Sequence, residues 1–295
     1  MGEGAGVLMA MLSSAVGGTG PALVRYMIGS TDPMTLAALR FGAGFVFLLP
    51  LAVSSYSNWP SGRDWIGVIG LGILFFGVCF SLFNWALSFT TAARGALAMS
   101  TLPLLTMVAA ALLGVERLTL RKTAGVLIAI GGTSLALATG LGDAPPDAWR
   151  GDLITLAAAL CMALYNIWSR PFIKRSSPLK YVTATMGAGS AFIAIVAGVL
   201  GDFSVVAGYG EPQWIAILSM GGISSALCFY LWVSALERTT PTRVASTLPL
   251  NPVTAALLAA ALLGEPIGLN LVFGIVAVLA GIWIATTDPK ALAKA

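Results

Sequence analysis

The sequence contains no histidine and few charged residues: 16 lysines and arginines and 12 aspartates and glutamates make up 9% of its 295 residues. A soluble domain carries about a quarter charged residues, so this deficit argues against a soluble fold. The absence of histidine removes the commonest metal ligand and the commonest proton shuttle at neutral pH. We therefore expect neither a soluble enzyme nor a histidine-based metal site.

Cysteine is also scarce, and its distribution predicts no disulfide framework. Cys79, Cys161 and Cys228 all fall within apolar stretches, where a thiol packs as a small hydrophobic group. The first residues, MGEGAGVLMAMLSS, lack the basic start and the small-residue cleavage site of a secretory signal. The first apolar stretch is therefore predicted to remain in the protein as a helix.

Apolar residues, by contrast, dominate the sequence, which is 58% hydrophobic and has a mean hydropathy of +0.91. Runs of about 20 apolar residues can cross a hydrocarbon core about 30 Å thick as helices. We predict ten such segments, joined by short connections: 5–28, 34–54, 65–89, 92–114, 121–140, 150–170, 178–200, 213–236, 241–263 and 270–287. The predicted fold class is all-α, a polytopic membrane protein with ten transmembrane helices.

Lysine and arginine in the short loops predict the orientation, because these residues favour the cytoplasmic side. Twelve fall on the side that carries both termini: Arg63, Arg117, Arg121, Lys122, Arg170, Lys174, Arg175, Lys180, Arg238, Arg243, Lys290 and Lys294. The opposite side collects only Arg25, Arg94 and Arg150. We therefore predict that both termini are cytoplasmic.

No acidic residue falls in the middle of a predicted helix. All twelve lie at helix ends or in loops: Glu3, Asp32, Asp64, Glu116, Asp143, Asp147, Asp152, Asp202, Glu211, Glu237, Glu265 and Asp288. A proton-coupled exporter of cations generally needs a buried carboxylate that exchanges a proton for its substrate. The sequence therefore predicts neutral or zwitterionic substrates, moved down a gradient or coupled through a group that the sequence does not identify.

The sequence also repeats itself. Identical residues recur at an offset of 149 over the later helices and of 145 over the first two, for example Cys79/Cys228, Arg94/Arg243, Pro103/Pro252, Glu116/Glu265 and Gly42/Gly187. The repeat divides the chain into two five-helix halves, 1–143 and 144–295. Because five is odd, the second half is predicted to enter the membrane upside down. Inverted repeats are typical of alternating-access transporters, whose substrate site lies between the halves.

Prolines interrupt several of the apolar segments, and the pentapeptide STLPL occurs twice, at 100–104 and 246–250. A proline removes an amide donor and kinks a helix. We therefore predict four kink or gating positions: Pro21, Pro103, Pro249 and Pro252. The freed carbonyls need partners, which neighbouring serine and threonine hydroxyls can supply. The bends either line a hydrated central pathway or shape static packing.

Four stretches resemble the EamA-type ten-helix carriers of the drug/metabolite transporter superfamily: LAALRFGAGF at 36–45, NWALSFTTAARGALAMSTLPLLTMVAAALLGVERLT at 84–119, AAALCMALYNIWSR at 157–170 and LPLNPVTAALLAAALLGEPI at 248–267. Their order and spacing extend the similarity over nearly the whole chain. The resemblance implies two inverted halves around a central cavity, and export of amino acids, other metabolites or drugs across a bacterial inner membrane. The chain looks similar to the aromatic amino-acid exporters of that family.

One departure from the family pattern concerns the predicted cavity. The family commonly has tryptophan in the middle of the first and sixth helices, eight residues before a basic residue. The corresponding positions in this sequence are Gly17 and Met162. The loss of two large rings is expected to enlarge or soften the cavity.

The candidate substrate-binding residues are small, polar or aromatic side chains on the predicted helices: Ser14, Gly17, Phe80, Asn84, Ser100, Met162, Tyr165, Asn166, Phe229, Tyr230, Thr247 and Asn251. Each also has a packing interpretation, because small residues and aromatic stripes serve helix contacts. Arg40 is the sole basic residue well inside an apolar segment. It is expected either to tie helices together or to bind a substrate carboxylate.

Taken together, these patterns predict a secondary transporter, an exporter or facilitator of small metabolites such as amino acids. The alternatives are an ion-coupled exporter of drugs or other metabolites, a channel, and a membrane-embedded enzyme. The sequence contains no HExxH and no GxxxxGK[ST] motif, which disfavours the enzyme. We expect no cofactor, no metal and no nucleic-acid partner. The expected partners are a small-molecule substrate and membrane lipid, with function as a monomer.

Overall fold

The structure is a computed structural model that describes residues 2–27, 29–138, 145–263 and 268–287. Within these ranges the chain forms helices and no β-strand, which confirms the all-α prediction. The elements, in chain order, are α1 Glu3–Gly17, α2 Gly20–Met27, α3 Pro33–Ser54, α4 Asp64–Gly72, η1 Ile73–Cys79, α5 Phe80–Ala86, α6 Ala92–Met99, α7 Leu102–Leu112, α8 Leu120–Ala136, α9 Ala148–Arg175, α10 Pro178–Leu200, η3 Phe203–Gly208, α11 Glu211–Ser219, η4 Met220–Leu227, α12 Cys228–Arg238, α13 Pro241–Ala245, α14 Leu250–Leu263 and α15 Leu269–Thr286.

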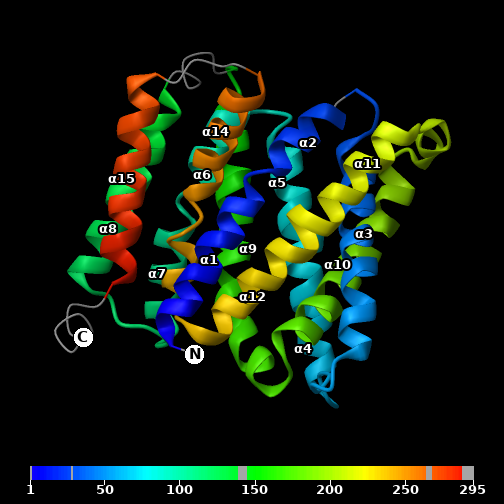
Figure 1. The fold of residues 1–295 in the computed structure, drawn as a ribbon, viewed down its shortest axis with the longest axis horizontal. Helices are drawn as coiled ribbons and strands as arrows, with labels where there is room; N and C mark the ends of the chain where they lie inside the picture. Colours follow the sequence, from blue (N-terminus) through cyan, green and yellow to red (C-terminus); the bar gives the residue numbers. More distant parts are fainter. Residues whose placement is uncertain (1, 28, 139–144, 264–267, 288–295) are drawn as a thin grey trace.

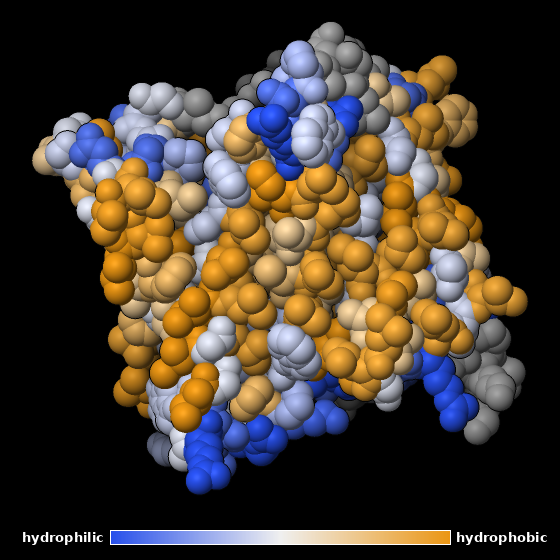
Figure 2. Space-filling model, turned by 180° about the vertical axis from the view of Figure 1, so that it is seen from behind, coloured by the Kyte–Doolittle hydropathy of each residue, from blue (hydrophilic) through white to orange (hydrophobic). Residues whose placement is uncertain are grey.

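The helices run side by side through one bundle (Figure 1). Seven helical stretches are long and apolar enough to cross a membrane: Pro33–Ser54, Asp64–Ala86, Ala92–Leu112, Ala148–Arg175, Pro178–Leu200, Glu211–Arg238 and Leu269–Thr286. On the face seen in Figure 2, a broad belt of hydrophobic side chains lies between two hydrophilic rims, as a bilayer-spanning protein requires. The membrane fold is therefore confirmed. Length and hydropathy alone support seven spans in the described ranges, and the predicted number of ten is not established by them.

We call the end of the bundle where α1 begins and α15 ends the terminal face, and the end where α2 meets α3 the distal face (Figure 1). Some charged residues used in the sequence predictions lie outside the described residues: Asp143, Glu265, Asp288, Lys290 and Lys294. The three cysteines are free thiols, as predicted.

Three predicted helices are broken rather than kinked. Segment 5–28 divides into α1 and α2, segment 92–114 divides at Ser100 and Thr101, and segment 241–263 divides at 246–249. Pro103 lies in the first turn of α7, where the missing amide of a proline costs no hydrogen bond. The prolines therefore begin new helices here instead of bending continuous ones.

Hydroxyl groups at these breaks donate hydrogen bonds to backbone carbonyls of the preceding turn. Ser100 Oγ donates to the Leu97 carbonyl over 2.7 Å. In the second half, Ser246 Oγ donates to the Thr242 carbonyl over 2.7 Å. Each carbonyl also accepts the amide of the same serine, so the hydroxyls find partners inside the protein and avoid the cost of an unpaired polar group in lipid.

Two other long stretches stay continuous but widen at their centres. The π-helical segments η1 and η4 interrupt the α4–α5 and α11–α12 stretches, respectively. A π-helical turn leaves one extra residue per turn and is frequent at functional sites. In this protein η4 supplies the contacts of Arg40 that are described below.

Helices α8 and α15 approach each other closely through facing glycines. A Cβ atom built on Gly132 of α8 would lie 2.7 Å from the Val278 amide nitrogen of α15 and 2.9 Å from the Gly274 carbonyl oxygen. The adjacent Gly131, by contrast, has no atom within 4 Å of a built Cβ. The close contact therefore depends on the absence of a side chain at Gly132 and not at the neighbouring Gly131.

This contact predicts opposite effects of two neighbouring substitutions. Gly132→Ala should destabilise the protein by about 1–3 kcal/mol, because the added methyl group pushes α15 away. Gly131→Ala should leave the stability unchanged or raise it slightly, since alanine is the better helix former. Thermal unfolding of the purified variants in detergent measures both, and equal melting temperatures for the two would contradict the packing.

Candidate functional site

A cavity of about 80 Å³ opens at the distal face between α2, α3 and α5. This volume is large enough for several water molecules or for part of a small solute. Ten side chains line it: Val24, Met27, Thr31, Pro33, Leu36, Ala37, Arg40, Phe41, Phe80 and Asn84. Three of them, Arg40, Phe80 and Asn84, are among the residues that the sequence predicts for the site.

Arg40 lies on α3 and is held by the second half of the chain. Its Nε donates to Ser225 Oγ over 2.9 Å and its Nη2 donates to the Ser224 carbonyl over 3.0 Å. Its guanidinium carbon lies 5.2 Å from the centre of the Phe41 ring, a cation–π distance. Among the described residues no carboxylate lies within 4.0 Å of this side chain.

The mouth of the cavity carries neutral polar groups. Asn84 Nδ2 donates to the Pro33 carbonyl over a long 3.4 Å. The Thr31 hydroxyl is buried and has no hydrogen-bond partner in the described part of the chain. The mouth can therefore still offer hydrogen bonds to a bound solute.

The nearby carboxylate of Asp32 is already engaged as the N-cap of α3. It accepts hydrogen bonds from the backbone amides of Met34, Thr35 and Asp202. Burial acts to raise the pKa of Asp32, but these hydrogen bonds outweigh it and lower the pKa overall. Asp32 is thus ionised and committed to backbone groups at the mouth.

Aromatic rings fill the bundle beneath the cavity. Phe41 and Phe80 line the cavity and also contact each other, with ring centroids 4.7 Å apart. Phe229 packs against Phe76 at 5.0 Å, and Tyr165 stacks on Phe75 at 4.3 Å. The predicted residues Phe80, Tyr165 and Phe229 therefore meet in one aromatic cluster, of which Phe41 and Phe80 line the cavity.

Four other predicted residues meet along a polar seam between α1 and the second half. Ser14 Oγ lies 2.9 Å from Thr247 Oγ1, within hydrogen-bond distance. A Cβ built on Gly17 would lie only 3.0 Å from Asn251 Oδ1, an atom that is buried and unpaired among the described residues. The absence of a side chain at Gly17 therefore leaves room that Asn251 occupies.

The remaining predicted residues lie elsewhere. Ser100 is engaged within its own chain segment, and Met162 is buried in the core. Asn166 is fully buried and accepts a hydrogen bond from Trp232 Nε1 over 2.9 Å. Tyr230 is 37% exposed and is not among the residues that line the cavity. The side chain of Pro21 lies outside the described residues.

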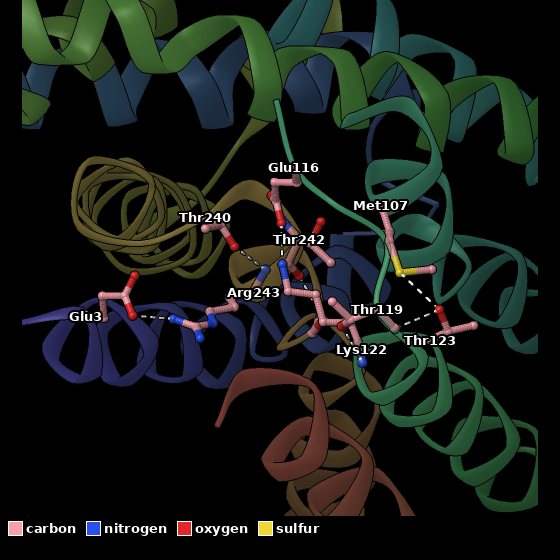
Figure 3. Close-up of polar contacts among 10 residues, drawn as sticks. Glu3, Met107, Glu116, Thr119, Lys122, Thr123, Thr240, Thr242 and Arg243 are labelled. Atoms are coloured by element: carbon pink, nitrogen blue, oxygen red, sulfur yellow. Dashed lines mark hydrogen bonds and ion pairs between the residues drawn. The ribbon is translucent and has the colours of Figure 1, made fainter. Parts of the chain in front are cut away.

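A polar network that the sequence pattern does not predict joins the two halves at the terminal face (Figure 3). Its centre is Glu116, in the loop between α7 and α8, whose side chain is 5% exposed. One carboxylate oxygen accepts from the Thr242 amide at the start of α13 over 3.0 Å, and the other accepts from Lys122 Nζ over 2.7 Å. Glu116 thereby links the loop of one half to a helix start in the other.

A second contact at the terminal face also joins the two halves of the chain. Arg243 of α13 donates through Nη1 to Glu3 Oε2 of α1 over 2.5 Å (Figure 3). Thr240 caps the same helix by accepting from the Arg243 amide over 3.4 Å. The sequence signal for this arrangement was the offset of 149, because Arg94 occupies the equivalent place in the first half.

The equivalent arginine makes an equivalent contact at the distal face. Arg94 forms an ion pair with Asp152 of α9, and Thr90 Oγ1 donates to the same carboxylate over 3.0 Å. Thr91 caps α6 by accepting from the Arg94 amide, as Thr240 does for Arg243. Each arginine thus reaches the first helix of the other half, one at each face of the bundle.

The family model described as the EamA-like transporter family matches residues 4–138 and 149–287, almost the whole chain. The chain belongs to this family. Among curated EamA-like relatives, the uncharacterized transporter YyaM of Bacillus subtilis is 26% identical over 90% of this chain and 88% of its own length.

An EamA-like relative with a named activity is the aromatic amino acid exporter YddG of Ancylobacter novellus. It is 29% identical over 74% of this chain and 75% of its own length. A solved crystal structure superposes on the EamA-like fold described above with a TM-score of 0.81 at 22% identity, covering 95% of each chain. At that identity the likeness concerns the fold alone.

The buried pair of Asn166 and Trp232 gives a prediction for the core of the bundle. Asn166→Leu should lower the stability by about 1–3 kcal/mol, because it leaves the Trp232 Nε1–H without an acceptor. The double variant Asn166→Leu with Trp232→Phe should lose less than the sum of the two single variants, since neither polar partner remains unpaired. Thermal unfolding measures this, and strict additivity would contradict the buried hydrogen bond.

Proposed function

We propose that this protein is a secondary transporter that carries small neutral or zwitterionic metabolites, amino acids among them, across the bacterial inner membrane by alternating access. The observation that carries the proposal is the difference between its two faces. A cavity opens at the distal face, whereas Glu116 bridges the two halves at the terminal face. Family membership supports transport, and the lining of the cavity supports the solute class.

The lining of the cavity favours an amphipathic solute. Its walls are mostly apolar, from Val24, Met27 and Leu36, and part of its lining is aromatic. The neutral groups of Thr31 and Asn84 lie at the mouth. Such walls suit a small molecule with one polar end, as the side chains and backbone groups of apolar amino acids provide. The relative YddG of Ancylobacter novellus, an aromatic amino acid exporter, agrees with this class.

The distribution of charge supports neutral or zwitterionic substrates. All six ion pairs among the described residues involve side chains near helix ends or loops, as with Arg175 and Asp64. A carrier that exchanges protons for cations needs a carboxylate along the solute path. Without one in the apolar part of the bundle, we expect movement down a gradient, or coupling through another group.

The contacts that close the terminal face are of a kind that can open. Alternating access needs two states separated by a few kcal/mol. The side chains of Glu116 and Arg243 are only 5% and 11% exposed, so separating them from Lys122 and Glu3 requires that water reach the buried charges as this face opens. If this face opened and the distal cavity closed, the bound solute would be exposed to the opposite side of the membrane.

Two halves with opposite orientation, 1–143 and 144–295, complete the proposal. The family model matches once within each half. Arg94 and Arg243 make equivalent contacts at opposite faces, as an inverted repeat requires. With the excess of lysine and arginine at the terminal face, we place both termini in the cytoplasm and the distal cavity on the outer side.

Counterflow in proteoliposomes tests the proposal. Vesicles loaded with unlabelled L-phenylalanine or L-leucine should transiently accumulate the labelled form from outside, and the rate should saturate, because a carrier exchanges one bound solute for another. Protein-free vesicles are the control. A flux that rises linearly with concentration would indicate a channel instead, and a chemically altered solute would indicate an enzyme.

A further inference from the structure

Arg40 has more hydrogen-bonding capacity than the protein uses. A guanidinium group carries five N–H donors. Two of them donate to Ser225 Oγ and the Ser224 carbonyl, and both acceptors are neutral. Among the described residues the group has no carboxylate partner and no further hydrogen bond. A cation within a membrane-spanning segment is costly without a counter-charge, so the missing anion requires an explanation.

The surroundings of Arg40 hold the guanidinium in place and leave space beside it. Both of its acceptors belong to η4, so the side chain is fixed between the two halves of the chain. A Cβ built on the facing Gly20 would come within 3.4 Å of Nη2 and 3.7 Å of Nη1. Glycine at that position keeps the side of the terminal nitrogens free of a side chain.

The same cavity contains the other groups that a small carboxylic acid would need. Its walls at Val24, Met27, Leu36 and Phe80 are apolar. The Thr31 hydroxyl is buried without a partner among the described residues. It can accept a hydrogen bond from an ammonium group, as can the side-chain oxygen of an asparagine such as Asn84.

From this arrangement we infer that Arg40 is the carboxylate-binding group of the cavity, and that the solute is a small monocarboxylate with an apolar tail, such as a zwitterionic amino acid. Charge-assisted bonds from the free N–H groups of Arg40 hold the carboxylate. Thr31 and Asn84 face the ammonium end, and Phe80 contacts the tail. The inference rests on the proposed function, since it takes the distal cavity as the solute path.

Four probes with the same six-carbon chain test the inference by binding alone. Hexanoate and L-norleucine carry a carboxylate, whereas hexanamide and hexylammonium do not. Ligand binding to the folded state raises its melting temperature. The wild-type protein in detergent should be stabilised by hexanoate and norleucine, and not by the other two. Arg40→Gln should weaken the two acids about ten- to a hundredfold, the value of one or two charge-assisted hydrogen bonds.

Arg121→Gln is the matched control. Arg121 also donates through Nε to a carbonyl, that of Ile284, and through Nη2 to a hydroxyl, that of Thr287, but it does not line the cavity. This variant should bind the acids as the wild type does. If Arg40→Gln fails to fold, Arg40→Lys should keep the preference for acids with weaker binding, because a lysine offers a point charge without the planar fork.

Several results would overturn the inference: equal binding of hexanoate and hexanamide, undiminished binding of the acids by Arg40→Gln, or no stabilisation of the wild type by either acid. These results are distinguishable from failure of the proposed transport. If the acids bind through Arg40 but no counterflow occurs, the carboxylate site is supported and the proposed transport is wrong. If amino acids show counterflow that Arg40→Gln does not change, the proposed transport is supported and the carboxylate site is wrong.

Discussion

Polar groups inside this bundle must find partners within the protein, because the surrounding lipid offers none. That requirement explains where the helices break. At Ser100 and Ser246 the hydroxyls bond to carbonyls of the preceding turn, and Pro103 begins the next helix without losing a hydrogen bond. The breaks let polar side chains such as Thr247 reach Ser14 in the interior, where continuous apolar helices would not place them.

The polar groups at the two faces of the bundle find partners within the protein in different ways. At the distal face, Arg40 takes neutral acceptors from η4 and stays without a carboxylate among the described residues, next to a cavity. At the terminal face, Glu116 and Arg243 find partners across the two halves and close the bundle. Between them the aromatic cluster of Phe41, Phe80 and Phe229 fills the centre. A solute that enters from one side can pass only if this cluster rearranges.

Much of the fold could be predicted from the sequence, because hydropathy reports directly on contact with lipid. The helical class, the membrane environment and the approximate helix ranges follow from it, and the family from the order of the motifs. The helix breaks could not be predicted, since the pattern around Pro103 is equally compatible with a kinked helix. Seven described stretches meet the length and hydropathy criteria, because broken or short helices such as α1 and α14 fall below them.

The site was predicted in part, for reasons that differ between residues. Phe80 and Asn84 were chosen as neighbours on one helix face, and both line the cavity. Tyr230 was chosen for its chemistry beside Phe229, but a one-residue step on a helix turns a side chain by about 100°, and Tyr230 is not among the residues that line the cavity. The role of Glu116 was missed because it depends on the path of a loop, which hydropathy does not determine. Its neighbour in space, Thr242, is 126 residues away in sequence.

The central claim is that the closed terminal face and the open distal cavity belong to one of two states between which the protein must move. A reversible thiol cross-linker between cysteines that replace Glu116 and Thr242, in a protein without its native cysteines, tests it most directly. The account predicts that cross-linking stops counterflow, that reduction restores it, and that a cysteine in place of Asn84 still reacts with a water-soluble thiol reagent while the cross-link is present. Undiminished counterflow in the fully cross-linked protein would contradict it.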